Sequence, residues 1–106
     1  MAAATIDKEA IRALENRAGA TAELLKVLAN DQRLIILCRL SDDELAFSEL
    51  GEYVNLAQSA LSQHLAKLRA HGLVTSRREG QNVYYRLANP MAQRLVGAVC
   101  KLNGGR

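Results

Sequence analysis

The chain has 106 residues, of which 49% are hydrophobic and 24% charged, and its formal net charge is +3 at pH 7. This length corresponds to one small domain, whose limited core would gain stability from dimerisation. No segment approaches the roughly 20 apolar residues of a membrane-spanning helix, and the N-terminus lacks the features of a signal peptide. We therefore expect a cytoplasmic protein without a membrane partner, whose two cysteines begin as thiols.

The charge is unevenly divided along the chain. Residues 1–57 contain six basic and ten acidic side chains, a net charge of −4. Residues 58–86 contain five basic side chains and one acidic side chain, and residues 87–106 add three basic side chains and no acidic one. Positive charge gathered in the second half indicates a polyanionic partner such as nucleic acid, although a solvated basic face would give the same pattern.

The first third of the chain is predicted to be helical. Two helices are expected over residues 7–18 and 20–29, with Gly19 as the break between them. The Asn-Asp pair at 30–31 can cap a third helix over 32–41. Because this third helix is apolar almost all round, we expect it at the buried centre of the domain.

Two short helices joined by a tight turn are predicted next. Ser48 can cap a helix that runs to Val54, and Asn55 suits the left-handed conformation of a sharp turn. A second helix is expected over about 58–70, ended by Gly72.

This second helix has two different faces. At roughly 100° per residue, three leucines form one stripe. The opposite side carries one lysine and otherwise short hydrogen-bonding side chains, whereas a helix that only faces solvent would more often carry several Glu and Lys. The stripe is Leu61, Leu65 and Leu68, and the polar side is Ser59, Ser62, Gln63 and Lys67. The two helices therefore describe a helix-turn-helix over about residues 46–71.

A β-hairpin and a last helix follow. Strands are predicted over 73–78 and 82–87 around a turn at 79–81, with Val83, Tyr85 and Leu87 on one face and Asn82, Tyr84 and Arg86 on the other. A hairpin directly after a polar helix, with Arg77 and Arg78 near its tip, is typical of a wing over about 73–87. Asn89 and Pro90 begin the last helix, whose apolar side would be Met91, Leu95, Val96, Val99 and Leu102. The predicted fold is mainly α with a small β-hairpin wing, a winged helix-turn-helix.

The segment AQSALSQHLAKLRAHGLVTSRREGQNVYYRL resembles the recognition helix and wing of the ArsR/SmtB bacterial repressors, and the helix order is similar over about residues 8–102. The resemblance implies a homodimer, with helices over about 7–18 and 89–102 forming the dimer contact. Its expected partner is a double-stranded DNA operator arranged as an imperfect inverted repeat. Ala57 departs from the family, in which serine is common at this position, and a missing N-cap would cost about 1 kcal/mol.

The resemblance also implies which residues face DNA. Glutamine can pair with an adenine edge, and serine can donate to a base or a phosphate. Lysine and arginine would supply sequence-independent attraction to phosphates. His64 lies near the border of the apolar stripe, so both a phosphate contact and a packed histidine are open for it. The DNA-facing set is Gln58, Ser59, Ser62, Gln63, His64, Lys67, Arg77 and Arg78.

Many members of this family bind metals, but the two familiar ligand patterns are missing from this sequence. One family pattern has cysteines in a segment like ELCVC, but the matching segment here is ELAFSEL, with Ala46 and Ser48 in place of thiols. Another pattern uses Asp, His and Glu in the last helix, which here reads PMAQRLVGAVCKL. Two cysteines alone cannot complete a four-coordinate zinc site within one protomer. The sequence therefore predicts neither a metal site nor a cofactor.

Cys38 and Cys100 are the remaining candidates for a sensing site. Their spacing of 62 residues does not show that they are close, and two unrelated buried cysteines would behave as small apolar residues. The segments LIILCRL and AVCKL, however, resemble those of the persulfide-responsive branch of the family, which is SqrR-, BigR- and HlyU-like. This resemblance implies that reactive sulfur species or oxidants link Cys38 to Cys100 by a disulfide or polysulfide and so lower DNA affinity.

The sequence is also compatible, to different degrees, with other functions. The chain could bind DNA constitutively, or act as an activator that displaces a DNA-bound silencer. A small thiol enzyme is disfavoured by the absence of C-x-x-C and of a Cys/His or Ser/His/Asp constellation outside the DNA-reading segment, so we predict that the chain is not an enzyme. A helical interaction module that does not bind DNA is disfavoured by the wing and its arginines.

Overall fold

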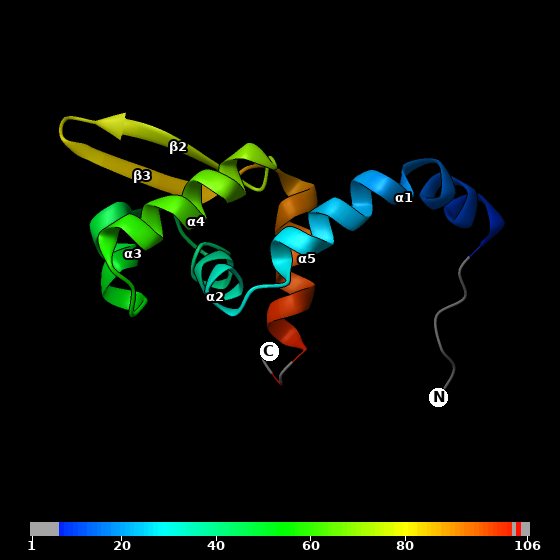
Figure 1. The fold of residues 1–106 in the computed structure, drawn as a ribbon, viewed down its shortest axis with the longest axis horizontal. Coiled ribbons are helices and arrows are strands. Elements are labelled where there is room, and N and C mark those ends of the chain that lie inside the picture. Colours follow the sequence, from blue (N-terminus) through cyan, green and yellow to red (C-terminus); the bar gives the residue numbers. More distant parts are fainter. Residues whose placement is uncertain (1–6, 103, 105–106) are drawn as a thin grey trace.

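The computed structural model describes residues 7–102 and 104. Figure 1 shows the hairpin and the short helices at one end of the molecule, with the first helix extending away toward the other end. The described part contains, in chain order, α1 (Lys8–Leu28), α2 (Asp31–Arg39), β1 (Leu45–Ala46), α3 (Phe47–Tyr53), α4 (Gln58–Ala70), β2 (Val74–Glu79), β3 (Asn82–Leu87) and α5 (Pro90–Lys101).

The first helix is continuous, so the predicted break at Gly19 is wrong. Asp7 caps α1, with its Oδ1 accepting a 2.7 Å hydrogen bond from the amide of Ala10, and the helix then runs through Gly19 to Leu28. A glycine inside a helix costs only about 1 kcal/mol relative to alanine, and the alanine- and leucine-rich flanks maintain the helix across it.

The helix α2 corresponds to the helix predicted over 32–41. It begins close to the predicted start but is less buried than predicted. Asn30 caps α2, accepting a 3.0 Å hydrogen bond from the amide of Arg33. Ile36 and Leu37 are buried, whereas Ile35 is 43% exposed. The helix therefore packs on one side only, and its other side faces solvent.

The helix-turn-helix is present, with two local corrections. The N-cap position of α3 is Ala46 and not Ser48, and the carboxylate of Glu49 accepts a 2.8 Å hydrogen bond from the amide of Ala46. Among the described residues only glycines have positive φ, so Asn55 does not adopt the left-handed conformation that we expected. The chain turns instead through extended residues such as Val54, which has φ −119° and ψ 144°.

The recognition helix α4 occupies the predicted residues. It begins after Ala57, which has no side-chain capping bond, and it is followed by Gly72 at φ +72°. That φ lies in the left-handed region, where glycine pays no steric penalty, so Gly72 allows the chain to leave the helix and enter the hairpin.

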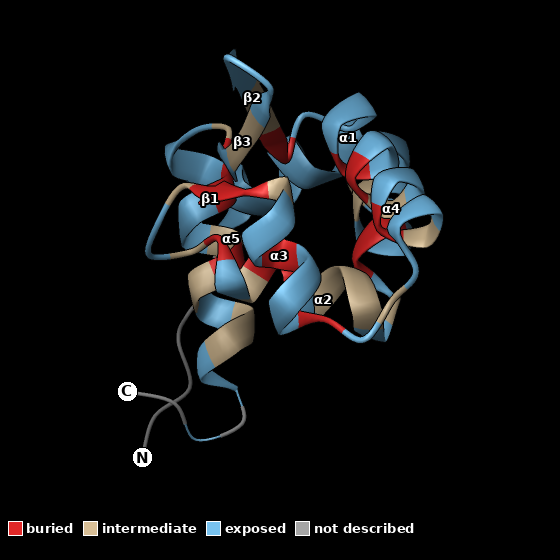
Figure 2. Cartoon of the chain, turned by 90° about the vertical axis from the view of Figure 1, so that its left-hand side faces the viewer, coloured by how far each residue is buried: buried red, intermediate tan, exposed pale blue. Residues whose placement is uncertain are grey.

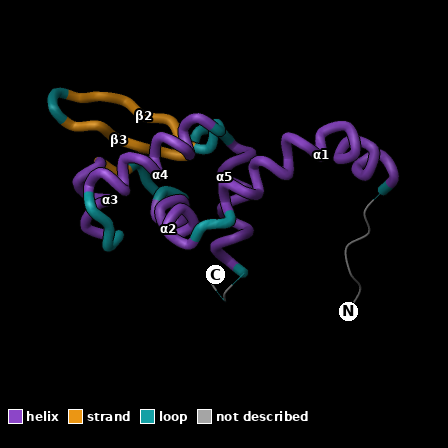
Figure 3. Tube along the Cα trace, in the orientation of Figure 1, coloured by secondary structure: helices purple, strands orange, loops and turns teal. Residues whose placement is uncertain are grey.

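The wing is a three-stranded antiparallel sheet in the order β1-β3-β2, and Figure 3 shows the hairpin of β2 and β3 beside α4. The hairpin of β2 and β3 was predicted, and its turn passes through Gly80 at φ +63°. The strand β1 was not predicted, because two residues are too short to show an alternating pattern. Leu45 and Ala46 pair with Tyr85 and Tyr84, so β1 joins the wing to the segment that follows α2.

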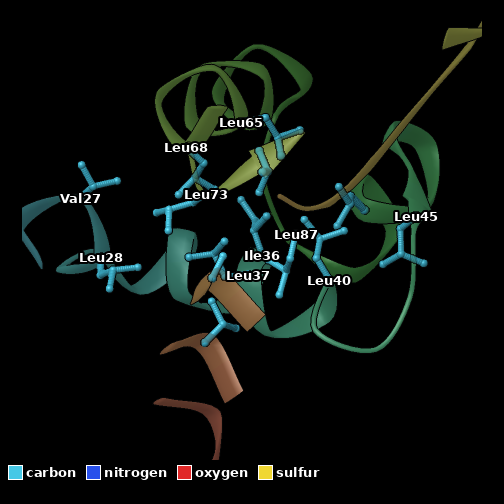
Figure 4. Close-up of a cluster of buried hydrophobic side chains, with 14 of the residues drawn as sticks. Val27, Leu28, Ile36, Leu37, Leu40, Leu45, Leu65, Leu68, Leu73 and Leu87 are labelled. Carbon is cyan, nitrogen blue, oxygen red and sulfur yellow. The ribbon is translucent and has the colours of Figure 1, made fainter. Parts of the chain in front are cut away.

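A leucine-rich core connects these elements. Leu61, Leu65 and Leu68 are each at most 1% exposed, which confirms the predicted apolar stripe of α4. Figure 4 shows Leu65, Leu68, Leu73 and Ile36 converging between α4 and α2. Because this packing buries one side of α4, it leaves the opposite side exposed (Figure 2).

The last helix begins as predicted, with Asn89 accepting a 2.8 Å hydrogen bond from the amide of Ala92 and Pro90 in the first turn. Its apolar side is only partly covered: Val96 is buried, whereas Met91 is 48% and Leu102 79% exposed. The first helix likewise exposes large apolar side chains, namely Ile11, Leu14 and Leu25.

Candidate nucleic-acid interface and cysteine pair

The polar face of α4 is on the surface of the protein. The five polar residues of α4 that were predicted to face DNA are all exposed: Gln58 in the first turn, and Ser59, Ser62, Gln63 and Lys67 away from the buried leucines. A rigid helix with one buried and one exposed polar side can present that side to the major groove of DNA.

An open groove of about 350 Å³ separates α4 from the wing. Ser62 lines it from α4, Ser48 from α3, and Gln81 and Asn82 from the hairpin. Sequence patterns did not single out Ser48, Gln81 or Asn82 as site residues, since only the tertiary fold brings them to Ser62. The groove and the exposed face of α4 together form a polar surface with several hydrogen-bonding groups.

The two wing arginines have different surroundings. Arg78 is exposed on β2. Arg77 donates from Nε and Nη2 to the carboxylate of Glu44, with N–O distances of 2.7–3.1 Å, and from Nη1 to Glu79 over 3.1 Å. The hydrogen bond from Arg77 lowers the pKa of the Glu44 carboxyl, and the same bond raises the pKa of the Arg77 guanidinium.

His64 lies at the contact between α4 and α2. It is half-buried, and its Nδ1 is 3.4 Å from Nη1 of Arg33. Arg33 also donates from Nε to the carbonyl oxygen of Val27 over 2.6 Å. This arrangement fits the packed role, which was one of the two roles left open for His64.

Cys38 and Cys100 are joined by a disulfide between α2 and α5, with their Cα atoms 5.9 Å apart. Both residues are half-buried beside the core. An open cavity of about 550 Å³ lies against the bridge, and Leu34, Ile35 and Val99 supply much of its apolar lining. Cys38 and Cys100 are themselves among the residues that line this cavity.

Arg39 is the basic residue closest in sequence to Cys38, and its guanidinium stacks on a ring. The Cζ atom of Arg39 lies 4.2 Å from the centroid of Tyr53, so α2 is tied to the end of α3. This contact is a cation–π interaction.

Among residues 7–102 and 104, no group of three or more His, Cys, Asp or Glu side chains is close enough to hold a metal ion. In the same residues, no helix is both long and apolar enough to cross a membrane.

A helix-turn-helix whose second helix exposes a polar face, followed by an antiparallel hairpin, defines a winged helix-turn-helix protein. The family model for the bacterial regulatory protein arsR family matches residues 30–76, from the start of α2 into β2. The transcriptional activator HlyU of Vibrio cholerae is 42% identical over 92 residues, which are 87% of this chain and 85% of HlyU. The chain belongs to the arsR family.

Solved structures agree with this assignment. The structure of reduced HlyU from Vibrio cholerae superposes with a TM-score of 0.81 at 41% identity, covering 89% of this chain and 99% of that one. A homodimeric winged helix-turn-helix DNA-binding domain from Mycobacterium bovis superposes with a TM-score of 0.71 at 32% identity, covering 96% and 90%.

A repressor is also among the relatives. The biofilm growth-associated repressor of Agrobacterium fabrum is 42% identical over 82% of this chain and 74% of the repressor. Since these relatives are transcriptional regulators, this chain is a transcriptional regulator of the arsR family and not an enzyme, as predicted.

Proposed function

We propose that this regulator binds a double-stranded DNA operator as a homodimer and releases it when Cys38 and Cys100 become linked by sulfur. The observation that carries the proposal is the disulfide between α2 and α5, because it joins a helix packed on the recognition helix to a helix with an exposed apolar side. Binding to an operator places this activity in the cytoplasm.

The exposed polar face of α4 supports operator binding. Gln58 and Gln63 can pair with adenine edges, and Ser59 and Ser62 can donate to bases or phosphates. Lys67 on the same helix supplies charge for the DNA backbone.

The uncovered apolar sides of α1 and α5 support a homodimer. An open groove of about 530 Å³ lies between these helices, with Leu24, Leu25, Met91 and Leu95 among the residues that line it. Burial of such side chains against a second copy would remove apolar surface from water. Two recognition helices related by a two-fold axis would then meet half-sites one turn of DNA apart, which matches an inverted-repeat operator.

The cysteine bridge supplies the proposed switch. Two thiols give up two protons and two electrons to an oxidant when they form a disulfide. A polysulfide can be that oxidant: the thiolates attack its S–S bonds, one or more of its sulfur atoms stay in the link, and the rest leaves as sulfide carrying the two electrons. The bridge constrains α2 relative to α5, and through them the recognition helix relative to the dimer helices. A preference of a few kcal/mol for the non-binding geometry would be enough to release DNA.

The test uses the full-length protein and a DNA shift assay with the operator. Reduced protein should bind, sodium tetrasulfide or peroxide should weaken binding, and a dithiol reductant should restore it. Cys38→Ser and Cys100→Ser should each bind DNA and fail to respond, and mass spectrometry should show the link in the parent only. If either single variant is released as the parent is, the dithiol mechanism is wrong.

A second candidate is constitutive or anti-silencing DNA binding, which the description of HlyU as an activator favours. In that case, operator affinity would not change with thiol state. A competition assay against a DNA-bound silencer would then show displacement by both the reduced and the oxidised protein.

A further inference from the structure

Arg77 and Glu44 form a bridge across the sheet of the wing. Ala46, Tyr84 and Arg77 lie in one row across β1, β3 and β2, so they share a face of the sheet. Glu44 precedes Ala46 by two residues, close to the same face, and Arg77 reaches across β3 to meet it. The Tyr84 ring lies beneath the guanidinium, with 4.5 Å between Cζ and the ring centroid.

The guanidinium of Arg77 is already engaged by two carboxylates. Glu44 takes the Nε and Nη2 donors in a two-pronged arrangement, with a shortest distance of 2.7 Å, and Glu79 takes an Nη1 donor over 3.1 Å. A DNA phosphate would have to displace a carboxylate at Arg77, and it would meet the negative charges of Glu44 and Glu79 there. These contacts favour a structural use of Arg77 over a phosphate contact.

Arg78 lies on the opposite face of the hairpin, because consecutive residues of a strand alternate. It pairs across the hairpin with Val83, and Ser76 pairs with Tyr85, so these residues share a face. Val83 and Tyr85 line the groove that Ser62 enters from α4. The Arg78 face is thus the face of the wing that is continuous with the polar surface of α4.

We propose that Arg77 is a positioning residue, which Glu44 holds so that the wing keeps its orientation beside α4, and that Arg78 is the wing arginine that contacts DNA phosphate. This inference rests on the proposed DNA binding. The part of the wing joined to the body by backbone pairing is short, since β1 contributes only Leu45 and Ala46. Glu44 lies directly before β1, so its bond to Arg77 extends this attachment to the outer strand β2.

The experiment compares Arg77→Ala with its matched neighbour Arg78→Ala, since each removes one positive charge from β2. Operator and random-sequence DNA are titrated over a range of salt concentrations with the full-length reduced protein. Hydrogen exchange of the wing amides is measured without DNA. A third set consists of Glu44→Arg, Arg77→Glu and the double variant with the pair reversed, all made in the Glu79→Gln variant as their parent, so that a glutamate at position 77 does not meet the Glu79 carboxylate.

We expect Arg77→Ala to speed exchange of the wing amides and to leave the salt slope unchanged. It should weaken binding to both DNAs about three- to tenfold, because a smaller fraction of the molecules would have the wing in the orientation that binds DNA. Arg78→Ala should leave exchange unchanged and reduce the salt slope by about one for each protomer, or about two for the dimer on its operator. The reversed pair should restore slow exchange and bring affinity within about threefold of the parent, whereas each single reversal should not.

A reduced salt slope for Arg77→Ala, with wing exchange unchanged, would overturn the inference and make Arg77 a phosphate contact. Failure of the reversed pair to restore slow exchange would also overturn it. If the unaltered protein bound no operator, the proposed DNA binding would be wrong. The hydrogen-exchange measurements are made without DNA, so they would still test the bond between Arg77 and Glu44.

Discussion

Cys38 and Cys100 are 62 residues apart in the chain, yet the disulfide brings their Cα atoms to 5.9 Å. Each lies beside the core that α2 shares with α5, and Ser41 caps the end of α2 by donating a 2.7 Å hydrogen bond to the carbonyl oxygen of Cys38. The bridge therefore joins α2 to α5 and closes a long loop that contains the helix-turn-helix and the wing.

Closing a loop of 62 residues restricts the unfolded chain, so the disulfide should stabilise the fold. For this loop length we expect about 4 kcal/mol from chain entropy, with measured values commonly between about 2 and 4 kcal/mol. Urea unfolding of oxidised and reduced protein at one fixed concentration measures the difference, and the Cys38→Ser/Cys100→Ser double variant should show none. Equal stability of the oxidised and reduced parent would contradict the prediction.

The dimer prediction is tested at Leu25, which is 54% exposed on α1. Leu25→Glu should convert the protein to a monomer and lower operator affinity, because a carboxylate would be buried in the apolar contact. Sedimentation velocity reports the mass in solution. Ala20→Glu is the matched control, since position 20 is exposed and lies on the other side of α1, where the same charge should leave the dimer intact.

The base-reading prediction concerns Ser62 and Gln63 on the exposed face of α4. Replacing each with alanine should weaken operator binding by about 1–3 kcal/mol per lost base contact and change binding to random DNA little. Fluorescence anisotropy with the two DNAs gives both affinities. Gln93→Ala, at an exposed position of α5, should change neither. Equal losses on the two DNAs would mean that these side chains contact only the backbone.

The start of α4 offers a stabilising substitution. Ala57 is at the N-cap position with φ −63° and ψ 152° and has no side-chain capping bond. Ala57→Ser should supply that bond and raise the free energy of unfolding by about 0.5–2 kcal/mol, whereas Ala57→Val should not. Urea unfolding monitored by circular dichroism measures the change. A serine variant no more stable than the parent would show that the orphan amides of α4 are satisfied in another way.

Local signals in the sequence were sufficient for most elements of the fold. The leucine stripe of α4, the caps at Asn30 and Asn89 and the glycine at the hairpin turn each act within a few residues, so they appear as short patterns. The same kind of signal misled at Gly19, where the helical preference of the flanking residues outweighed one glycine, and at Asn55, where extended residues made the turn.

The winged helix-turn-helix follows from sequence patterns, because the periods of its helices and strands decide which sides can be buried. It also supplied the polar face of α4, as the side opposite the leucines. Three contacts arise only in the folded chain: β1 with Tyr84 and Tyr85, Cys38 with Cys100, and Arg77 with Glu44, which is 33 residues away. They join residues far apart in the chain, so only the packing of the core brings them together.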